Sequence, residues 1–317
     1  MPGLGTRESP PYISDVGMPL QPPVDIAQQV AHSVHLAKSG IAGLVLMGST
    51  GEAIHMSRYE RVELISGVRQ GLDEAGYHEY PIMAGVLVNS VDETLEWLRD
   101  SAEAGAQWGL VLAPGYFGAA ASQDNLVEWF TMVAENSPLP ILIYNYPGVT
   151  NNLVVAVETY VKLASHPNIV GCKMSHGNVS HHVQVSLHPT IDHKSFRVYS
   201  GFGQQLGPIV MFNAAGVIDG LAAIFPKTIV QLFNLAAQRP ADEKAQEEVR
   251  RLQWKVSSAE EFIVKNGILG IREAIFKVLG MGHLDGGRLP LKGSLPPGVW
   301  EQWSDALGQM VDQENSL

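Results

Sequence analysis

Residues 168–178 read NIVGCKMSHGN, and this stretch places a lysine, Lys173, inside an otherwise apolar run of strand-forming residues. A lysine buried in a strand loses the hydration that it keeps on a surface, so it needs either an anionic partner or a lowered pKa. The run is continuously apolar rather than alternating, as in parallel strands that are covered on both faces. The stretch therefore predicts a buried parallel strand that carries an amine.

Six further apolar runs of this kind are spaced along the chain. They comprise residues 41–48, 81–87, 109–114, 140–145, 196–201 and 216–223. The segments between them have helical patterns, and Ser57 and Ser90 each stand three residues before a glutamate, as in a capping box. Gly40 and Gly105 fall where a left-handed residue ends a helix just before the next strand.

This alternation of strands and helices predicts an α/β protein, a (β/α)8 TIM barrel with residues 10–16 as the eighth strand. A doubly wound open sheet is the alternative, because counting repeats does not show that a sheet closes. After the last strand the alternation stops, and residues 259–280 have a helical pattern. We therefore expect a barrel with the catalytic site over residues 1–235 and a C-terminal helical domain over residues 236–317.

The composition narrows the class of partner and the compartment. The chain has 32 acidic and 21 basic residues, a formal charge of −11, and no run of Lys or Arg, so neither nucleic acid nor an anionic membrane is an expected partner. The longest apolar runs are too short to span a bilayer, and residues 1–17 lack the pattern of a secretory or transit signal. The single cysteine, Cys172, suits a reducing compartment. We expect a cytoplasmic protein.

Polar side chains stand where the predicted strands end. In a barrel, chemistry takes place at the C-terminal ends of the strands, because the loops that follow them converge there. Tyr144 and Lys173 belong to consecutive strands, so the phenol and the amine should lie side by side. A desolvated lysine can attack a ketone to form a Schiff base, and a nearby tyrosine can move protons. In residues 48–52, the hydroxyls of Ser49 and Thr50 and the backbone N–H groups can bind a carboxylate.

Three short motifs resemble those of one known family, the dihydrodipicolinate synthase and N-acetylneuraminate lyase superfamily of pyruvate-type class I aldolases. They are GSTGE at residues 48–52, YNYP at 144–147 and GCKMS at 171–175, followed by YSGFG and AAGVIDGLAAIFP. The motifs occur in the family's order, and the resemblance extends over roughly residues 10–300. It implies a barrel enzyme that uses no metal and no cofactor and acts on a small 2-keto acid.

The resemblance also implies roles for individual residues. Lys173 would form the Schiff base and Tyr144 would shuttle protons. Ser49 and Thr50 would bind the substrate carboxylate and relay protons. Tyr116 resembles a tyrosine that reaches across a subunit interface towards the active site, which implies a homo-oligomer, a tetramer or a dimer. The other residues expected to contact substrate are Gly201, Ile218, Ser175 and His176.

One departure from the family pattern bears on the substrate. Dihydrodipicolinate synthases have an arginine two residues after the proline of the YNYP motif, and this chain has Val149 there. A valine cannot pair with a distal carboxylate, which makes lysine biosynthesis the less favoured alternative. A neutral, hydroxylated aldehyde half fits better, and a 2-keto-3-deoxy sugar acid has one. The side chains that can hydrogen-bond its hydroxyls are Ser175, His176, Asn178 and Asp219.

Within the superfamily, the chain looks most like the fungal L-threo-3-deoxy-hexulosonate (2-keto-3-deoxy-L-galactonate) aldolases of galacturonate degradation. The resemblance therefore implies a lyase that cleaves this acid to pyruvate and L-glyceraldehyde. The 4-hydroxy-2-oxoglutarate aldolases are the near alternative.

Two functions outside this class stay open. Five histidines, together with Asp219, suggest a metal-dependent lyase. The histidines lack HExxH or Cys/His ligand spacing, and most of them are predicted to be surface or helix residues, with His176 near the rim. The five are His176, His181, His182, His188 and His193. A barrel that only senses a keto acid is the other possibility, and the intact Lys173 and Tyr144 argue against it. Taken alone, Lys173 could also be a structural lysine paired with a buried carboxylate. Cys172 should point to the opposite layer from Lys173, as a small core residue.

Overall fold

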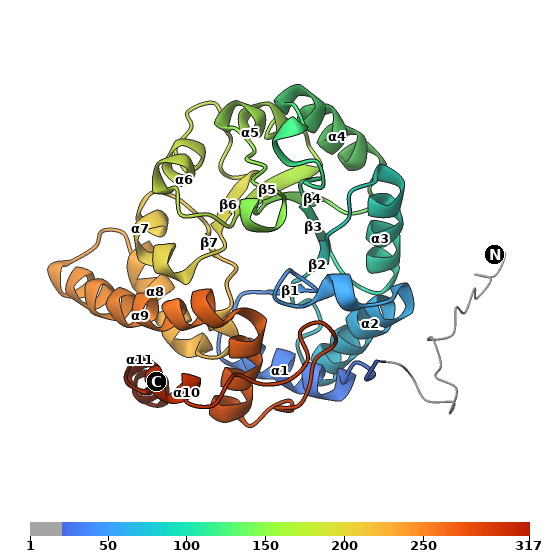
Figure 1. Ribbon diagram of the computed structural model, residues 1–317. Coiled ribbons are helices and arrows are strands. Elements are labelled where there is room, and N and C mark those ends of the chain that lie inside the picture. The colour runs from blue at the N-terminus through green and yellow to red at the C-terminus, as the bar shows by residue number, and fades with distance from the viewer. Residues whose placement is uncertain (1–20) are drawn as a thin grey trace, which may run out of the picture.

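The computed structural model describes residues 21–317 (Figure 1). Its centre is a curled sheet of seven parallel strands that follow one another in chain order. They are β1 (Leu44–Leu46), β2 (Ile82–Val86), β3 (Trp108–Leu112), β4 (Ile141–Asn145), β5 (Ile169–Met174), β6 (Arg197–Ser200) and β7 (Gly216–Val217). All seven predicted apolar runs thus contain a strand. Residues 10–16, predicted as the eighth strand, lie outside the described residues.

Eight helices alternate with these strands and form the outer ring of Figure 1. They are α1 (Ile26–Lys38), α2 (Arg58–Glu74), α3 (Val91–Glu103), α4 (Gln123–Asn136), α5 (Val157–Leu163), α6 (Val179–Ser186), α7 (Leu206–Met211) and α8 (Pro226–Ala237). Ser57 and Glu60 form a complete capping box at the start of α2, whereas Ser90 caps α3 through its own side chain alone. Gly40 and Gly105 have φ values of +90° and +105°, which confirms the predicted left-handed helix ends.

The strands separate two apolar layers, because successive side chains point to opposite faces. On β4, Leu142 and Tyr144 belong to an interior cluster, while Ile143 joins the larger core between the sheet and the helices. On β5, Cys172 is buried in that larger core, as predicted. Lys173, the next residue, is therefore directed to the interior of the barrel, on the same side as Tyr144.

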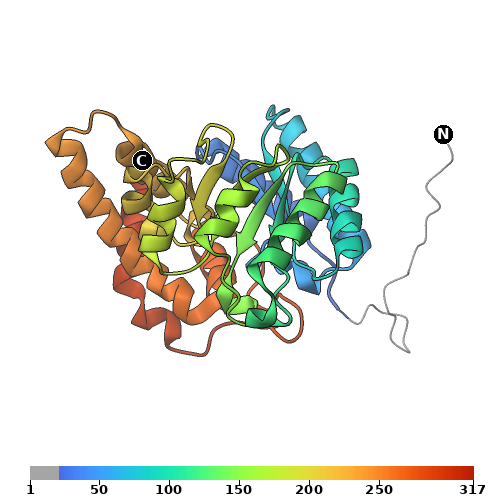
Figure 2. The same cartoon turned by 90° about the horizontal axis from the view of Figure 1, so that it is seen from above.

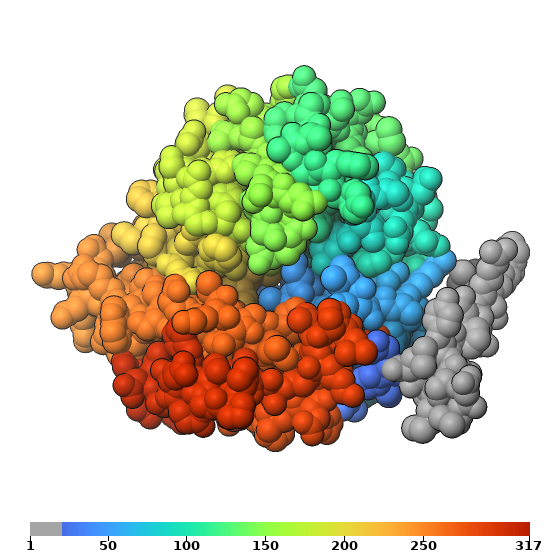
Figure 3. All heavy atoms as spheres, viewed as in Figure 1, coloured from blue at the N-terminus to red at the C-terminus, as the bar shows by residue number. Residues whose placement is uncertain are grey.

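Three helices follow the barrel. They are α9 (Glu243–Ala274), α10 (Val299–Gln302) and α11 (Ser304–Asn315). Seen from above in Figure 2, α9 runs along one flank of the barrel, and Figure 3 shows these segments, orange to red, in one continuous surface with it. Their apolar side chains share a core with α8, in which Leu232, Phe262 and Met310 are fully buried. The predicted C-terminal helices are confirmed, and the division of the chain at residue 236 stays a prediction.

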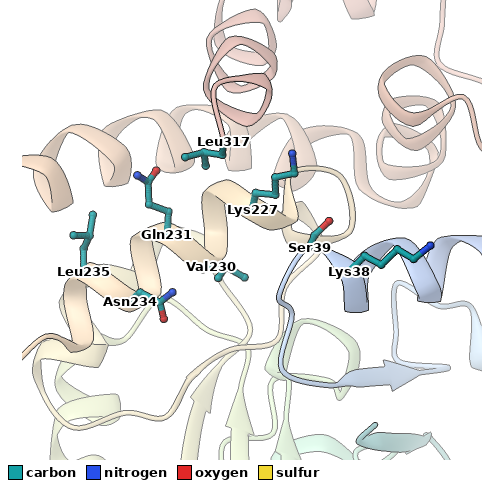
Figure 4. Close-up of a pocket in the computed structure, with 8 residues that line it drawn as sticks. All are labelled: Lys38, Ser39, Lys227, Val230, Gln231, Asn234, Leu235 and Leu317. Carbon is teal, nitrogen blue, oxygen red and sulfur yellow. The ribbon is translucent and has the colours of Figure 1, made fainter. Parts of the chain in front are cut away.

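An open groove of about 500 Å³ lies in the outer layer, between α1, α8 and the C-terminal residue (Figure 4). Its lining residues are Lys38, Ser39, Lys227, Val230, Gln231, Asn234, Leu235 and Leu317. Ser39 ends α1 just before β1, which is the side at which the strands begin. The groove is therefore separate from the strand ends that carry Lys173. Among residues 21–317, no helix is long and apolar enough to cross a membrane.

Candidate active site

Lys173 and Tyr144 form the centre of the candidate site. The two residues are paired in the register of β4 and β5. The Lys173 side chain is only 8% exposed, and its Nζ lies 4.6 Å from the centroid of the Tyr144 ring. Adjacent strands thus bring together the amine and the phenol, as the order of the motifs led us to expect.

The environment of Lys173 favours the neutral amine more than water does. Burial lowers the pKa of Lys173 from 10.5 to about 8, and the negative charge of Asp219 acts in the opposite direction. Lys173 takes part in none of the ion pairs formed among residues 21–317. A structural lysine would need such a pair to offset the loss of hydration. Lys173 is therefore a buried amine without an ion-pair partner among the described residues.

Tyr144 is 2% exposed, and its hydroxyl group faces two others. The distance from Tyr144 Oη to Ser49 Oγ is 3.2 Å. Burial raises the pKa of Tyr144, while the hydroxyl groups of Ser49 and Ser175 lower it by a smaller amount. The phenol therefore holds its proton at neutral pH. A chain of hydroxyls beside an amine can pass a proton along, because each member both donates and accepts.

The turn over residues 48–52 follows β1 and folds back over β2. Met47, which precedes it, has a φ of +59°. A Cβ atom at Gly85 of β2 would lie 2.0 Å from the Met47 carbonyl oxygen, so only glycine allows this approach. The turn thereby places the Ser49 hydroxyl next to the Tyr144 hydroxyl. Thr50 is exposed, and its side chain has no hydrogen bond to any residue that the structure describes. Glu52 pairs locally with a histidine in the next turn, at 3.1 Å.

The ends of β5, β6 and β7 bring three further predicted residues to the same rim. The N–H group of Gly201 donates to the Met174 carbonyl at 2.9 Å, and that of Ile218 donates to the Ser200 carbonyl at 2.8 Å. Ser175 is buried next to Gly201, where a Cβ atom would lie only 1.9 Å from Ser175 Oγ. Ser175, Gly201 and Ile218 therefore line the same end of the barrel as Lys173.

The ring of His176 lies against the rings of two other histidines. Its ring stacks on that of His181 with 5.0 Å between centroids and lies 4.8 Å from that of His182. Burial, followed by the charges of these two neighbours, lowers the pKa of His176 to about 4. His181 and His182 are buried residues of α6. Over the described part of the chain, no group of three or more His, Cys, Asp or Glu residues is arranged to hold a metal.

Tyr116 is not brought to Lys173 within the chain. It lies in the loop after β3, where its side chain is 73% exposed and that of Phe117 is 79% exposed. The two rings are 5.2 Å apart at their centroids and meet edge to face. Asn89 Oδ1 accepts the backbone N–H of Tyr116 at 3.0 Å and fixes the loop. This places two aromatic rings at the surface.

Two polar residues near the site carry roles that sequence reasoning did not assign. Asn145 is fully buried and holds the loop after Tyr144, because its amide donates to the Leu153 carbonyl at 2.9 Å and accepts the Val155 N–H at 3.2 Å. Its place in the YNYP motif was the available signal. Glu260 of α9 is buried against the loops after β6 and β7, and no local pattern marks it.

Fold and site together define an α/β-barrel protein with a buried amine at the C-terminal ends of its strands. Residues 23–292 match the sequence profile of the Dihydrodipicolinate synthetase family. The chain therefore belongs to this family.

Known relatives agree with this assignment. The "L-threo-3-deoxy-hexylosonate aldolase" of Hypocrea jecorina is 34% identical over 274 residues, 85% of either chain. The "Probable 4-hydroxy-2-oxoglutarate aldolase, mitochondrial" of Emericella nidulans is 34% identical over 260 residues, 82% of either chain. Among solved structures, the chloride-inhibited dihydrodipicolinate synthase from Acinetobacter baumannii, complexed with pyruvate, is 25% identical with a TM-score of 0.79 over 95% of both chains. The TIM-barrel prediction is confirmed.

Proposed function

We propose that the protein is a class I aldolase, a carbon–carbon lyase that cleaves a 2-keto-3-deoxy sugar acid through a Schiff base on Lys173. The observation that carries this proposal is the buried amine itself, with a pKa of about 8, lying over the ring of Tyr144. A neutral amine is the nucleophile that a ketone requires, and burial increases the fraction of Lys173 that is neutral near pH 7 far above that of an ordinary lysine, without a metal or a cofactor.

The first half of the proposed reaction forms an electron sink. The lone pair of Lys173 attacks the keto carbon of the substrate and gives a carbinolamine. The carbinolamine oxygen leaves as water after it accepts a proton, and a protonated imine remains. The hydroxyls of Tyr144 and Ser49, 3.2 Å apart, supply and recover the protons.

The second half breaks the C3–C4 bond. Removal of the proton from the C4 hydroxyl lets the electrons of that bond move to the imine nitrogen, so an aldehyde leaves and an enamine remains. The enamine is protonated at C3, and water releases pyruvate from Lys173. Because the pKa of Tyr144 is raised by burial, its phenol acts as a relay that gives up one proton while it accepts another.

The substrate carboxylate would be bound by the turn over residues 48–52. Its backbone N–H groups and the hydroxyls of Ser49 and Thr50 supply donors, which the negative charge of the whole chain makes necessary. Gly201 and Ile218 would also line the carboxylate side of the site. Ser175 would contact a substrate hydroxyl, and His176, predicted to do the same, would do so only if its ring left the histidine stack.

L-threo-3-deoxy-hexulosonate is the substrate we propose, with pyruvate and L-glyceraldehyde as products. A relative that is named for this activity, together with Val149 in an exposed position that offers no cation, supports it. 4-Hydroxy-2-oxoglutarate is the alternative, supported by the relative from Emericella nidulans, and dihydrodipicolinate synthesis is less favoured. Galacturonate degradation in the cytoplasm is the setting we propose.

We further propose a homo-oligomer, a dimer or a tetramer, in which Tyr116 approaches the site of a neighbouring subunit. Two adjacent aromatic rings that are more than 70% exposed support this, since monomeric proteins rarely leave such apolar groups uncovered together. Sedimentation of the wild-type protein and of Tyr116→Ala tests it. A purely monomeric wild-type protein would rule the proposal out.

Reduction with borohydride in the presence of pyruvate tests the proposed chemistry. The imine should become a stable secondary amine, and peptide mapping should locate the added mass on Lys173. Lys173→Ala should show no adduct and no turnover. Normal turnover in Lys173→Ala would exclude the mechanism. A substrate panel of 2-keto-3-deoxy hexonates, 4-hydroxy-2-oxoglutarate and aspartate semialdehyde would separate the candidate substrates.

A further inference from the structure

Two carboxyl groups face each other beside the candidate active site. Asp219 follows β7, and Glu260 extends from the middle of α9. Glu260 is 3% exposed, and both oxygens of Asp219 are buried. Neither Asp219 oxygen nor Glu260 Oε1 has a hydrogen-bond partner among the described residues. The backbone N–H groups of Gly203 and Leu221 act on the Glu260 carboxylate and lower its pKa, but burial and Asp219 outweigh them.

Gly203 shows how closely the two groups approach each other. A Cβ atom at this position would lie 2.4 Å from Glu260 Oε1 and 2.7 Å from Asp219 Oδ2. Both oxygens therefore point at the same small space, which is open only because the residue is glycine. Two ionised carboxylates cannot share such a buried space without a cation, so one proton must remain on the pair.

The pair also belongs to the surroundings of the amine. Asp219 is the charged group that acts on Lys173, and its charge favours the protonated lysine. The other titratable neighbours of Lys173 on the flanking strands are Tyr144 and Tyr199, and burial raises the pKa of both, so they stay neutral. Burial, followed by the charge of Asp219, also raises the pKa of Glu260.

We propose that Glu260 is a positioning residue of the amine site, a neutral carboxylic acid that donates a hydrogen bond to Asp219. The pair then presents one negative charge to Lys173 instead of two. A single charge offsets part of the cost of burying the amine, whereas two charges would hold it protonated. The inferred role of Glu260 rests on the proposed function of Lys173. The protonation state of the carboxyl pair can be measured whether or not the protein is an aldolase.

Infrared spectroscopy of the unliganded protein tests the shared proton directly. The wild-type protein at neutral pH should show the C=O stretching band of a buried carboxylic acid, shifted in D2O. The band should persist in Glu261→Gln, a matched control in which the next, exposed carboxylate of α9 is removed. It should be absent from Glu260→Gln. The isotope shift identifies the acid in the wild-type protein even if a variant does not fold.

The pH dependence of pyruvate trapping by borohydride tests the effect on Lys173. Glu260→Gln should keep the wild-type midpoint, because the amide donates to Asp219 as the acid does and the net charge is unchanged. The double variant Asp219→Asn/Glu260→Gln should have its midpoint at lower pH, by on the order of one unit, since the charge that favours the protonated amine is gone. A midpoint that falls equally in Glu260→Gln would show a second negative charge and overturn the proposal.

The two proposals fail in different ways. An absent infrared band in the wild-type protein would overturn the role of Glu260, whatever the trapping result. If pyruvate left no adduct on Lys173 at any pH while the band was present, the aldolase mechanism would fall and the shared proton would stand.

Discussion

At the scale of single residues, Lys173 is the position at which reactivity and stability oppose each other. The pKa of Lys173 is about 8 in the folded protein, against 10.5 for an ordinary solvated lysine such as that of the unfolded chain. Below pH 8 the amine is protonated in both states, and the folded protein bears the cost of a buried charge. As the pH rises from 8 to 10.5, the folded protein has lost a proton that the unfolded chain still binds, so this cost fades.

We therefore predict that Lys173→Met stabilises the protein at pH 7, by roughly 3 kcal/mol at most, while it abolishes activity. The gain should shrink above pH 8 and vanish near pH 10.5. Urea unfolding of both proteins across this range measures it. A variant that is no more stable than the wild type at pH 7 would show that Lys173 is less buried than its environment indicates.

The wild-type enzyme should form its imine with a rate that rises as the pH increases and levels off above about 8, because only the neutral amine attacks. Single-turnover measurements of pyruvate trapping between pH 6 and 10 check this. A plateau that begins below pH 7 would contradict the assigned pKa.

Tyr144→Phe should lower kcat by about 100-fold or more, because the proton relay beside the amine is broken. Tyr160→Phe is the matched control. Tyr160 is also completely buried, but its hydroxyl has no hydrogen-bond partner among residues 21–317, so its removal should leave turnover unchanged. Equal losses in the two variants would point to packing instead of proton transfer.

At the scale of elements, the position of Lys173 depends on how closely β5 and β6 approach. A Cβ atom at Gly171 of β5 would lie 2.2 Å from the Arg197 carbonyl oxygen of β6. A backbone carbonyl cannot move aside as a flexible side chain can, so an added Cβ atom would force β5 and β6 apart. Gly171, two residues before Lys173, thus helps to fix the direction of the lysine side chain.

Gly171→Ala should therefore lower both the thermal midpoint and activity, with a cost in stability of about 1–3 kcal/mol. Gly177→Ala lies in the loop after the same strand, where an added Cβ atom meets nothing within 4 Å, and it should be neutral. Thermal unfolding and steady-state kinetics of the two variants compare them directly. A fully stable and active Gly171→Ala would refute the steric argument.

At the scale of the whole molecule, the C-terminal helices pack against α8 in the outer layer of the barrel. Glu314 of α11 caps α8: its carboxylate accepts the N–H groups of Lys227 at 2.9 Å and Thr228 at 2.8 Å, and the Thr228 hydroxyl at 2.7 Å. A charge at a helix start that is also hydrogen-bonded is a strong contact. The end of the chain is thus fastened to a helix of the barrel.

Glu314→Gln should destabilise the protein by about 2 kcal/mol. The charged carboxylate accepts three hydrogen bonds, whereas the NH2 group of a glutamine amide is a donor and cannot accept from the groups that it would face. Glu301→Gln removes an exposed carboxylate from the same region and should change stability very little. Denaturant unfolding of both variants measures the difference. Identical midpoints would show that the cap adds nothing.

The sequence by itself determined the order of strands and helices, the helix caps at Ser57 and Ser90, and the pairing of Tyr144 with Lys173. These features depend on local chemistry, since apolar periodicity and capping act within a few residues and consecutive strands of a barrel are neighbours. The motifs also predict Ser49 and Gly201 as site residues, and the structure places both at the C-terminal ends of the strands.

Only the tertiary structure decided which distant groups meet. The contact of Ser49 with Tyr144 and the approach of Glu260 to Asp219 both join segments far apart in the chain. Such contacts arise from the packing of whole elements, and no pattern within one segment specifies them. The charge beside Lys173 therefore could not be derived from the residues around it in the sequence.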